Sequence, residues 1–325
     1  GGESVSALLS QMKRILYGEP NRSVQHDEAL ELAKQLLSTE LLAELIARLP
    51  QLEFECRKDV TQVFSNILRK HSCGVMLAVE WLAQRPHVLF TILQGYADPR
   101  VALNYGTMFR ECCRHEALVA LLLPTPTSRA AYELFGYIES PHFDVASDAF
   151  ASLRELLTKH RTLVARFLEA QYDDFFTYYH ALLRSDNYVT KRQSLKLLSE
   201  LLLDRANFAT MTRYIMSSAH LKTIMMLLRD PSPSIQIEAF HVFKIFVANP
   251  NKGHEVYDLL RRNKVQRDAR ALPLPSSRWL SPGPSQEKLL VFLAGFQNER
   301  AEEQFGEEKK FLIHEIEHLE DAEGS

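Results

Sequence analysis

The sequence predicts an all-α fold, and two observations support this prediction. The first is the placement of proline and glycine: residues 142–230 contain neither, although a β-sheet protein needs such turn residues within a stretch of that length. The second is a recurring pattern of paired apolar residues separated by two mostly polar ones. The second apolar residue of this pattern falls at Phe64, Phe109, Leu153, Leu198 and Phe243, with spacings of 45, 44, 45 and 45 residues.

A repeat of this length is typical of HEAT and armadillo units, which span about 40–47 residues. Each unit has room for two or three helices, which bury their apolar faces only when neighbouring units stack. The sequence therefore predicts a right-handed α-solenoid of armadillo/HEAT-like helical repeats with a period of 45 residues.

The repeat pattern also predicts how the chain is divided. We expect residues 1–263 to form an N-terminal helical cap followed by the repeats. Residues 264–286 contain four prolines and several serines and are predicted to be a flexible insertion. We expect residues 287–320 to form C-terminal helices that close the same solenoid, and residues 321–325 to form a frayed tail.

Composition and charge exclude several classes of protein. The 325 residues carry 38 basic and 41 acidic side chains, a net charge of −3. Residues 299–325 contribute −7 of this, so the rest carries only +4, too little for a general nucleic-acid binder. No apolar run is long enough to span a membrane, and no secretory leader pattern is present. The four cysteines form no CxxC pair, so we expect reduced thiols in a cytoplasmic protein.

One short motif has the pattern of a metal site. His314-Glu315-Ile316-Glu317-His318 matches H-E-x-x-H, in which two histidines on one helix face bind zinc and the glutamate polarises a water molecule. The sequence offers no third ligand at zincin spacing and no sheet to wall a substrate cleft. No phosphate-binding loop, nucleophile elbow or EF-hand loop is present. We therefore predict no catalytic residue, no metal and no cofactor, and keep a zinc-dependent hydrolase as an alternative.

A polar stripe on one predicted helix suggests a binding surface instead. In the helix expected over residues 187–204, an angle of 100° per residue places Tyr188, Arg192 and Lys196 together, away from the apolar face. Residues 187–229 hold seven basic and two acidic residues, a local charge of +5. Aromatic side chains beside arginines are typical of protein–protein interfaces.

The repeat register extends this surface to a neighbouring unit. The residues ten positions before each repeat marker are Phe54, Pro99, Phe143, Tyr188 and Pro233. Phe143 and Tyr188 therefore occupy equivalent positions in adjacent units, and we expect them to line one groove. The alternative is that these aromatics complete the packing between repeats while the basic residues form a solvated face.

Several ungapped blocks closely resemble the calcium-binding protein 39 family. They are KDVTQVFSNIL (58–68), FDVASDAF (143–150), DNYVTKRQSLKLL (186–198) and EAFHVFKIFVANPNK (238–252). The resemblance implies an armadillo-like scaffold without catalysis. It also implies that the scaffold binds a STRAD-like pseudokinase or germinal-centre-type serine/threonine kinases, holds them in an active-like conformation, and acts in kinase signalling and cell polarity or morphogenesis.

The resemblance further implies two sets of site residues. We call the first the kinase-binding face, which would lie on the concave side of the solenoid: Phe143, Tyr188, Arg192, Lys196, Arg205 and Phe208. We call the second the tail pocket, which would accept a Trp-Glu-Phe tail: Lys222, Met225 and Arg262. Met225 would provide a soft apolar floor, while the two basic side chains would pair with the glutamate. The predicted insertion begins beside Arg262, so we expect it to reshape or partly cover this pocket.

The sequence thus predicts a non-catalytic, monomeric scaffold that binds and allosterically activates a pseudokinase or kinase. It predicts neither nucleic-acid nor membrane binding. Besides the zinc hydrolase, the remaining alternative is an α-solenoid that binds another peptide or RNA.

Overall fold

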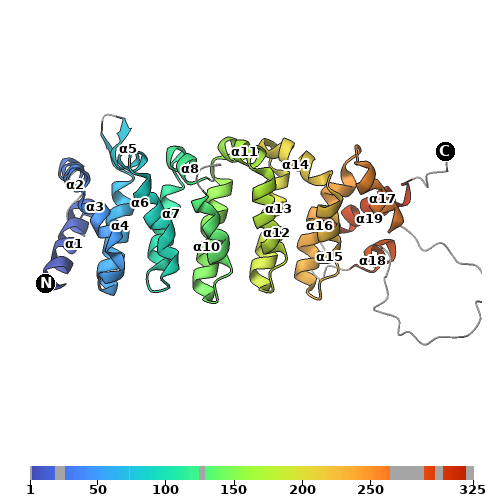
Figure 1. The fold of residues 1–325 in the computed structure, drawn as a ribbon, viewed down its shortest axis with the longest axis horizontal. Helices are drawn as coiled ribbons and strands as arrows, with labels where there is room; N and C mark the ends of the chain where they lie inside the picture. The colour runs from blue at the N-terminus through green and yellow to red at the C-terminus, as the bar shows by residue number, and fades with distance from the viewer. Residues whose placement is uncertain are drawn as a thin grey trace, which may run out of the picture. The chain divides into compact units, whose positions relative to one another are not determined.

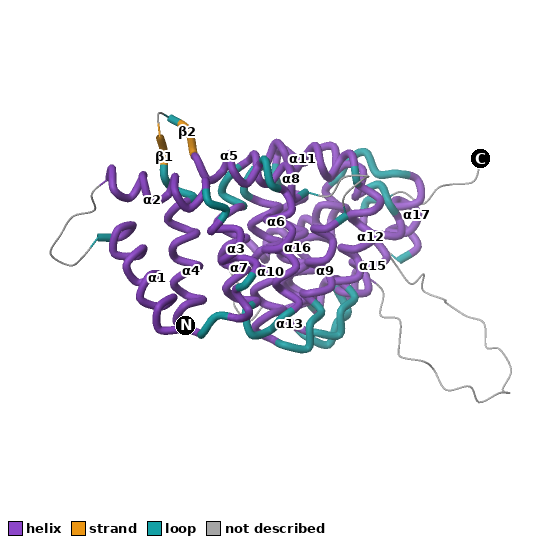
Figure 2. The backbone as a smooth tube through the Cα atoms, turned by 60° about the vertical axis from the view of Figure 1, so that its left-hand side comes forward, coloured by secondary structure: helices purple, strands orange, loops and turns teal. Residues whose placement is uncertain are grey.

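The computed structural model describes residues 2–18, 26–72, 74–123, 129–263, 289–296 and 303–319. Within these ranges the chain is almost entirely helical, with a single two-stranded hairpin (Figures 1 and 2). Two compact units are present, one made of residues 1–197 and 204–207 and the other of residues 198–203 and 208–325. The predicted insertion at 264–286 and the predicted tail at 321–325 lie outside the described residues.

The first unit contains the elements up to the first part of α13. They are α1 (Gly2–Tyr17), α2 (His26–Ser38), α3 (Leu41–Ala47), η1 (Leu49–Gln51), α4 (Phe54–Ile67), β1 (His71–Ser72), β2 (Val75–Met76), α5 (Leu77–Ala83), α6 (Pro86–Gln94), η2 (Gly95–Ala97), α7 (Ala102–Cys112), α8 (Glu116–Leu122), η3 (Ala130–Tyr132), α9 (Glu133–Ile138), α10 (Phe143–Thr158), α11 (Arg161–Ala170), α12 (Tyr172–Leu183), α13 (Tyr188–Leu203) and η4 (Arg205–Asn207).

The second unit contains the end of α13 and the elements that follow η4. They are α14 (Phe208–Ile215), α15 (Ser218–Leu227), α16 (Pro233–Ala248), α17 (His254–Arg262), α18 (Leu289–Gly295) and α19 (Glu303–Glu317).

The repeat inferred from the sequence is confirmed helix by helix. The five marker residues lie on α4, α7, α10, α13 and α16, and none is more than 2% exposed. In the first unit, α1, α4, α7 and α10 pack against one another in that order (Figure 1). A second row pairs α3 with α6 and α9 with α12, and a third row runs α2, α5, α8. In the first unit the repeats therefore supply three rows of helices, and the helices of the pairs named here pack on their counterparts in the next repeat, which is the armadillo arrangement.

Polar contacts between repeats have the same spacing. Lys13 pairs with Asp59, Arg69 with Glu111, and Arg129 with Asp174, at 2.6, 2.8 and 2.9 Å and at sequence separations of 46, 42 and 45 residues. Each pair joins one repeat to the next. These polar contacts fix the register between neighbouring repeats, because a helix shifted along its neighbour would break them.

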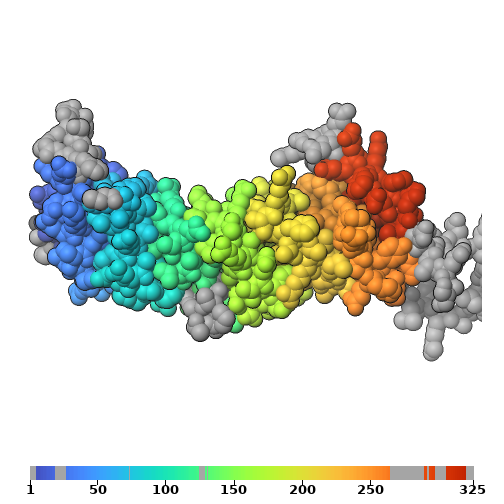
Figure 3. Space-filling model, turned by 90° about the horizontal axis from the view of Figure 1, so that it is seen from above, coloured from blue at the N-terminus to red at the C-terminus, as the bar shows by residue number. Residues whose placement is uncertain are grey.

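The second unit closes around an aromatic cluster. Phe240 on α16 lies 5.5 Å from Phe296 and 5.0 Å from Phe305 on α19, measured between ring centroids. Lys244 on α16 pairs with Glu308 on α19 at 2.5 Å. In the space-filling view, the residues of α19 (red) lie against the orange residues of the same unit (Figure 3). The C-terminal helices thus cover apolar residues of α16 that water would otherwise reach.

The hairpin of β1 and β2 is a feature that the sequence did not predict. His71 pairs with Met76 and Ser72 with Val75, and Gly74 between them adopts φ +81°, a conformation that favours glycine.

The described cysteines Cys56, Cys112 and Cys113 are buried free thiols, and burial raises the pKa of Cys112. None of the described helices is long and apolar enough to cross a bilayer.

Candidate protein-binding surface

The starts of the long helices present aromatic side chains to solvent. Phe143 is the first residue of α10 and is 65% exposed, and Tyr188 is the first residue of α13 and is 43% exposed. The start of α13 is well defined, because the Asn187 side chain accepts hydrogen bonds from the backbone N–H groups of Val189 and Thr190 at 2.9 and 3.3 Å. The structure therefore leaves the two register-equivalent aromatics exposed at the surface.

The predicted stripe on α13 is also exposed. Tyr188, Arg192 and Lys196 follow one another at intervals of four residues, and all three are exposed, whereas Leu195 and Leu197 are at most 1% exposed. All of these residues belong to the first unit. An interval of four residues advances by 400°, so these three side chains lie along one side of the helix.

The remaining two residues of the kinase-binding face follow α13. Arg205 is exposed in η4 and belongs to the first unit. The turn before it is held by Asp204, which accepts a hydrogen bond from the Ala206 N–H at 2.9 Å and pairs with Arg161 at 3.2 Å. Phe208 begins α14 in the second unit and is 67% exposed.

The tail-pocket residues lie on two helices that pack together in the second unit. Lys222 is exposed and Met225 half-buried on α15, and their separation of three residues puts them on the same side of that helix. Arg262 is the exposed last residue of α17, with its guanidinium 3.8 Å from Asp258. α15 and α17 contact each other, so an apolar side chain and two cations are available within one helix pair.

The second unit also contains an apolar groove that the sequence did not reveal. It has a volume of about 720 Å³ and lies between the end of α13, α14 and α16. Its lining is Ser199, Leu203, Phe208, Met211, Thr212, Ile215, Met216, His241, Lys244, Ile245, Ala248, Asn249, Pro250 and Asn251. The exposed side chains of Leu203, Phe208 and Met216 form its open edge. Phe208, inferred only as a contact residue, is therefore part of a cavity large enough for an apolar side chain.

The groove is close to electrically neutral. Burial lowers the pKa of His241, and the nearby Lys244 lowers it further, so the imidazole is uncharged at pH 7. Lys244 is itself paired with Glu308. A smaller pocket of about 310 Å³ shares Lys244 and Ala248 with the groove, and Phe311 lies at its edge. The groove therefore suits an apolar ligand group better than a charged one.

Comparison with known proteins identifies the family of this chain. The model of the Mo25-like family matches residues 2–266 of this chain. The chain belongs to the Mo25-like family. The mouse (Mus musculus) protein "Calcium-binding protein 39-like" is 46% identical over 321 residues, covering 98% of this chain and 88% of that protein. The fission yeast (Schizosaccharomyces pombe) "Mo25-like protein" is 41% identical over 318 residues, covering 98% and 89%. The family resemblance inferred from the sequence is confirmed.

A designed armadillo repeat protein also aligns with this Mo25-like chain. It covers 76% of the chain and 94% of the designed protein, with a TM-score of 0.43 and 12% identity.

The H-E-x-x-H motif of this Mo25-like chain lies at the end of α19, with His318 directly after the last helical residue. His314 and His318 are exposed with ring centroids 3.9 Å apart, and Nδ1 of His318 lies 2.7 Å from the backbone oxygen of His314. Burial lowers the pKa of Lys252, and the nearby carboxylate of Glu315 partly opposes this effect. Among the residues that the structure describes, no group of three or more His, Cys, Asp or Glu side chains could hold a metal ion. A zinc site of the hydrolase type would need a third ligand there.

Two features of the surface were outside the reach of sequence reasoning. Leu203 and Met216 are apolar residues in amphipathic helices, and only the packing of α14 against α16 leaves them at a groove rather than in the core. Phe54 was recognised as a register equivalent of Phe143 and Tyr188 but not as a site residue. It begins α4 and is 66% exposed.

Proposed function

We propose that this Mo25-like chain is a non-catalytic, cytoplasmic scaffold that binds a STRAD-like pseudokinase or a germinal-centre-type serine/threonine kinase and activates it allosterically. One observation carries the proposal: Tyr188, Arg192 and Lys196 are exposed along one side of α13, with Phe143 exposed at the equivalent start of α10. Aromatic and basic side chains held on rigid helices are suited to a folded protein partner. A role in cell polarity or morphogenesis would follow from the kinase that is activated.

The proposed mechanism is a population shift. A scaffold activates a kinase without chemistry if it binds the active-like conformation more tightly than the inactive one. A difference of about 3–5 kcal/mol makes a minor conformation the dominant one. Rigid presentation favours such discrimination, since the helices that carry the face are locked by repeat packing and do not adapt to the wrong conformation.

The kinase-binding face is tested by reversing one charge. Arg192→Glu should weaken binding of a purified STRAD-like pseudokinase at least tenfold, because it places an acidic group where the partner meets a basic one. Because Arg192 is exposed, the melting temperature should stay unchanged. Isothermal titration calorimetry and thermal melting measure the two quantities.

The matched control is Lys34→Glu, which reverses an exposed charge on α2, away from the face. It should bind like the wild-type chain. Equal binding by Arg192→Glu and wild type would refute the assignment of the face.

A second contact is proposed at the tail pocket. The tail's aromatic residues would pack on Met225, and its glutamate would pair with Lys222 or Arg262. Met225→Ala should weaken the binding of a fluorescein-labelled peptide ending in Trp-Glu-Phe more than tenfold, because it removes the half-buried apolar floor of the pocket. Fluorescence anisotropy measures this affinity.

The adjacent Met226 supplies the control for this pocket. It is the same residue type on the same helix, but it is 62% exposed. Met226→Ala should leave the peptide affinity unchanged. Similar losses in both variants, or none in either, would rule out Met225 as the pocket floor.

A further inference from the structure

The two histidines at the end of α19, which we call the histidine pair, have no part in the proposed function. His314 is exposed on α19, and His318 is exposed directly after its last helical residue. The backbone N–H of His318 donates a hydrogen bond to the backbone oxygen of His314 at 3.1 Å, so the turn of the helix continues through His318. The two imidazoles therefore lie one turn apart on the same side, with ring centroids 3.9 Å apart.

The hydrogen bonding of the rings leaves nitrogen atoms that can bind a ligand. Nδ1 of His318 lies 2.7 Å from the backbone oxygen of His314. A carbonyl oxygen only accepts, so Nδ1 carries the proton and Nε2 of the neutral ring keeps a free lone pair. Histidines that bind a metal through one ring nitrogen usually donate from the other in this way. Within the described part of the chain, the His314 ring makes no hydrogen bond or ion pair.

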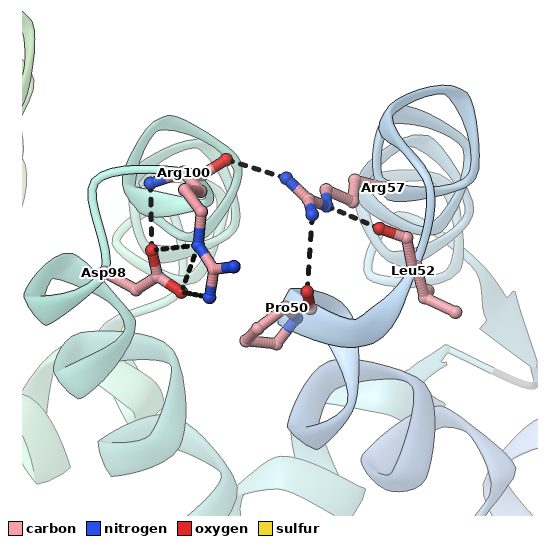
Figure 4. Close-up of polar contacts among 5 residues, drawn as sticks. All are labelled: Pro50, Leu52, Arg57, Asp98 and Arg100. Carbon is pink, nitrogen blue, oxygen red and sulfur yellow. Dashed lines mark hydrogen bonds and ion pairs between the residues drawn. The ribbon is translucent and has the colours of Figure 1, made fainter.

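The charged side chains between α4 and α7 show the opposite situation. Every nitrogen of the Arg57 guanidinium donates to a backbone oxygen, at 2.8 Å to Leu52, 3.0 Å to Arg100 and 3.3 Å to Pro50 (Figure 4). Arg100 itself pairs with Asp98 at 2.7 Å (Figure 4). These groups are used to join neighbouring segments of the protein, whereas the histidine pair presents its nitrogens to solvent.

The surroundings of the histidine pair favour a cation. The pair lies at the C-terminal end of α19, where the helix dipole has its negative pole. α19 carries five acidic and two basic side chains, a charge of −3. Exposed Glu317 precedes His318, and exposed Lys310 lies one turn before His314. The ammonium of Lys252 faces Glu315 and donates to the backbone oxygen of Asn249 at 2.8 Å, so this charge is balanced by an acid of its own.

We propose that the histidine pair is a non-catalytic site for a divalent late transition-metal ion such as Zn²⁺ or Cu²⁺, with water molecules as the remaining ligands. Zn–N bonds are about 2.0–2.1 Å long, so two nitrogens on one ion are about 3 Å apart, which small rotations of these exposed rings allow. The described residues hold no group of three ligands, so the site differs from that of a hydrolase. The ion joins successive turns and fixes the end of the helix that packs on α16.

The test titrates the full chain with the metal alone, measured by isothermal titration calorimetry. Zinc chloride should show one tight site per chain, and copper(II) chloride should bind more tightly, because imidazole sites follow the Irving–Williams order. Magnesium chloride should not bind, since Mg²⁺ prefers oxygen ligands. His314→Ala and His318→Ala should each weaken zinc binding about tenfold or more, because the second imidazole no longer binds intramolecularly.

His254→Ala is the matched control. The His254 side chain is 90% exposed on α17 of the same unit, and its partner four residues later is a carboxylate, Asp258 at 3.6 Å, rather than a second imidazole. His254→Ala should bind zinc like the wild-type chain. All three variants should keep the wild-type melting temperature without metal, which separates loss of a ligand from loss of structure.

Hydrogen exchange measured by mass spectrometry detects the effect on the helix directly. Zinc should slow the exchange of the backbone amides at the end of α19 in the wild-type chain and in His254→Ala, but not in His318→Ala. Wild-type zinc affinity in His314→Ala and His318→Ala would overturn the site. One zinc ion shared by two chains would also overturn it, because the second copy and not water would then complete the coordination.

Discussion

At the scale of single residues, Phe208 shows how a side chain gains a role through distant neighbours. It is 67% exposed at the start of α14, yet it lines a groove of about 720 Å³ with Leu203 and Met216. A phenylalanine at a groove edge contributes both apolar area and a flat surface for packing. The groove is neutral and apolar, so an apolar side chain of the partner is the group that fits it.

Truncating Phe208 should therefore affect binding and not folding. Phe208→Ala is expected to weaken pseudokinase binding about 10–50-fold, because aromatic anchors at interfaces contribute about 2 kcal/mol or more. The melting temperature should change little, since the ring is mostly exposed. Surface plasmon resonance and thermal melting provide the two readouts.

Phe311→Ala serves as its control, because Phe311 is 48% exposed at the smaller neighbouring pocket. It should retain wild-type affinity. If Phe311→Ala weakened binding while Phe208→Ala did not, the smaller pocket would be the contact.

At the scale of helices, the contact between α7 and α10 shows what aligns one repeat on the next. Tyr96 donates a hydrogen bond to Asp148 at 2.6 Å and lies 2.7 Å from the Ser152 hydroxyl, and Arg110 pairs with Asp148 at 2.8 Å. Burial raises the pKa of Tyr96, with Asp148 adding to the effect, so the hydroxyl remains a donor. Gly106 makes room for this network: a Cβ there would lie 1.8 Å from the Asp148 carboxylate.

Adding one methyl group should disrupt this contact between repeats. Gly106→Ala is expected to lower the free energy of unfolding by about 2–4 kcal/mol, since the half-buried Asp148–Arg110 pair must shift or lose its partners. Urea denaturation followed by circular dichroism measures this change.

Gly136→Ala on α9 is the matched substitution, because nothing lies within 4 Å of the added Cβ. It should leave stability unchanged or raise it by about 0.4–1 kcal/mol. Equal effects of the two substitutions would mean that helix propensity, and not the network, controls stability at Gly106.

At the scale of the whole molecule, charge is unevenly distributed along the chain, and one segment has the opposite sign to the net charge. The chain carries −3 overall, but residues 187–229 carry +5 and residues 299–325 carry −7. A local excess of basic residues on a mildly acidic chain would steer an acidic protein partner without creating general affinity for polyanions.

Salt should therefore slow association with the partner. The association rate with the pseudokinase is expected to fall about tenfold between 50 and 500 mM NaCl, measured by stopped-flow fluorescence, because salt screens electrostatic steering. Arg192→Glu should show a shallower dependence. Micromolar binding of a single-stranded RNA at 150 mM NaCl would favour the RNA alternative instead.

The alternative of a zinc hydrolase also belongs to this scale, because it depends on which residues the fold brings to α19. His314 on α19 and His318 just beyond its end have ring centroids 3.9 Å apart, but the described residues provide no group of three potential ligands. A short motif has catalytic meaning only when the tertiary structure supplies the remaining ligands and a cleft.

The sequence alone determined the helical class, the repeat length and the family. Apolar residues at a constant spacing specify which side of each helix is buried, and that local information is enough to place Phe64, Phe109 and Phe243 in the core. It also put Phe143 and Tyr188 in one register, because equivalent positions of stacked repeats share an environment.

Only the tertiary structure decided which apolar residues stay exposed. Leu203, Phe208 and Met216 form a groove because of where α16 lies beside α14, and Gly106 is needed because of a carboxylate 42 residues away on α10. Periodicity along a helix identifies a face, but whether another helix covers that face depends on contacts between distant parts of the chain.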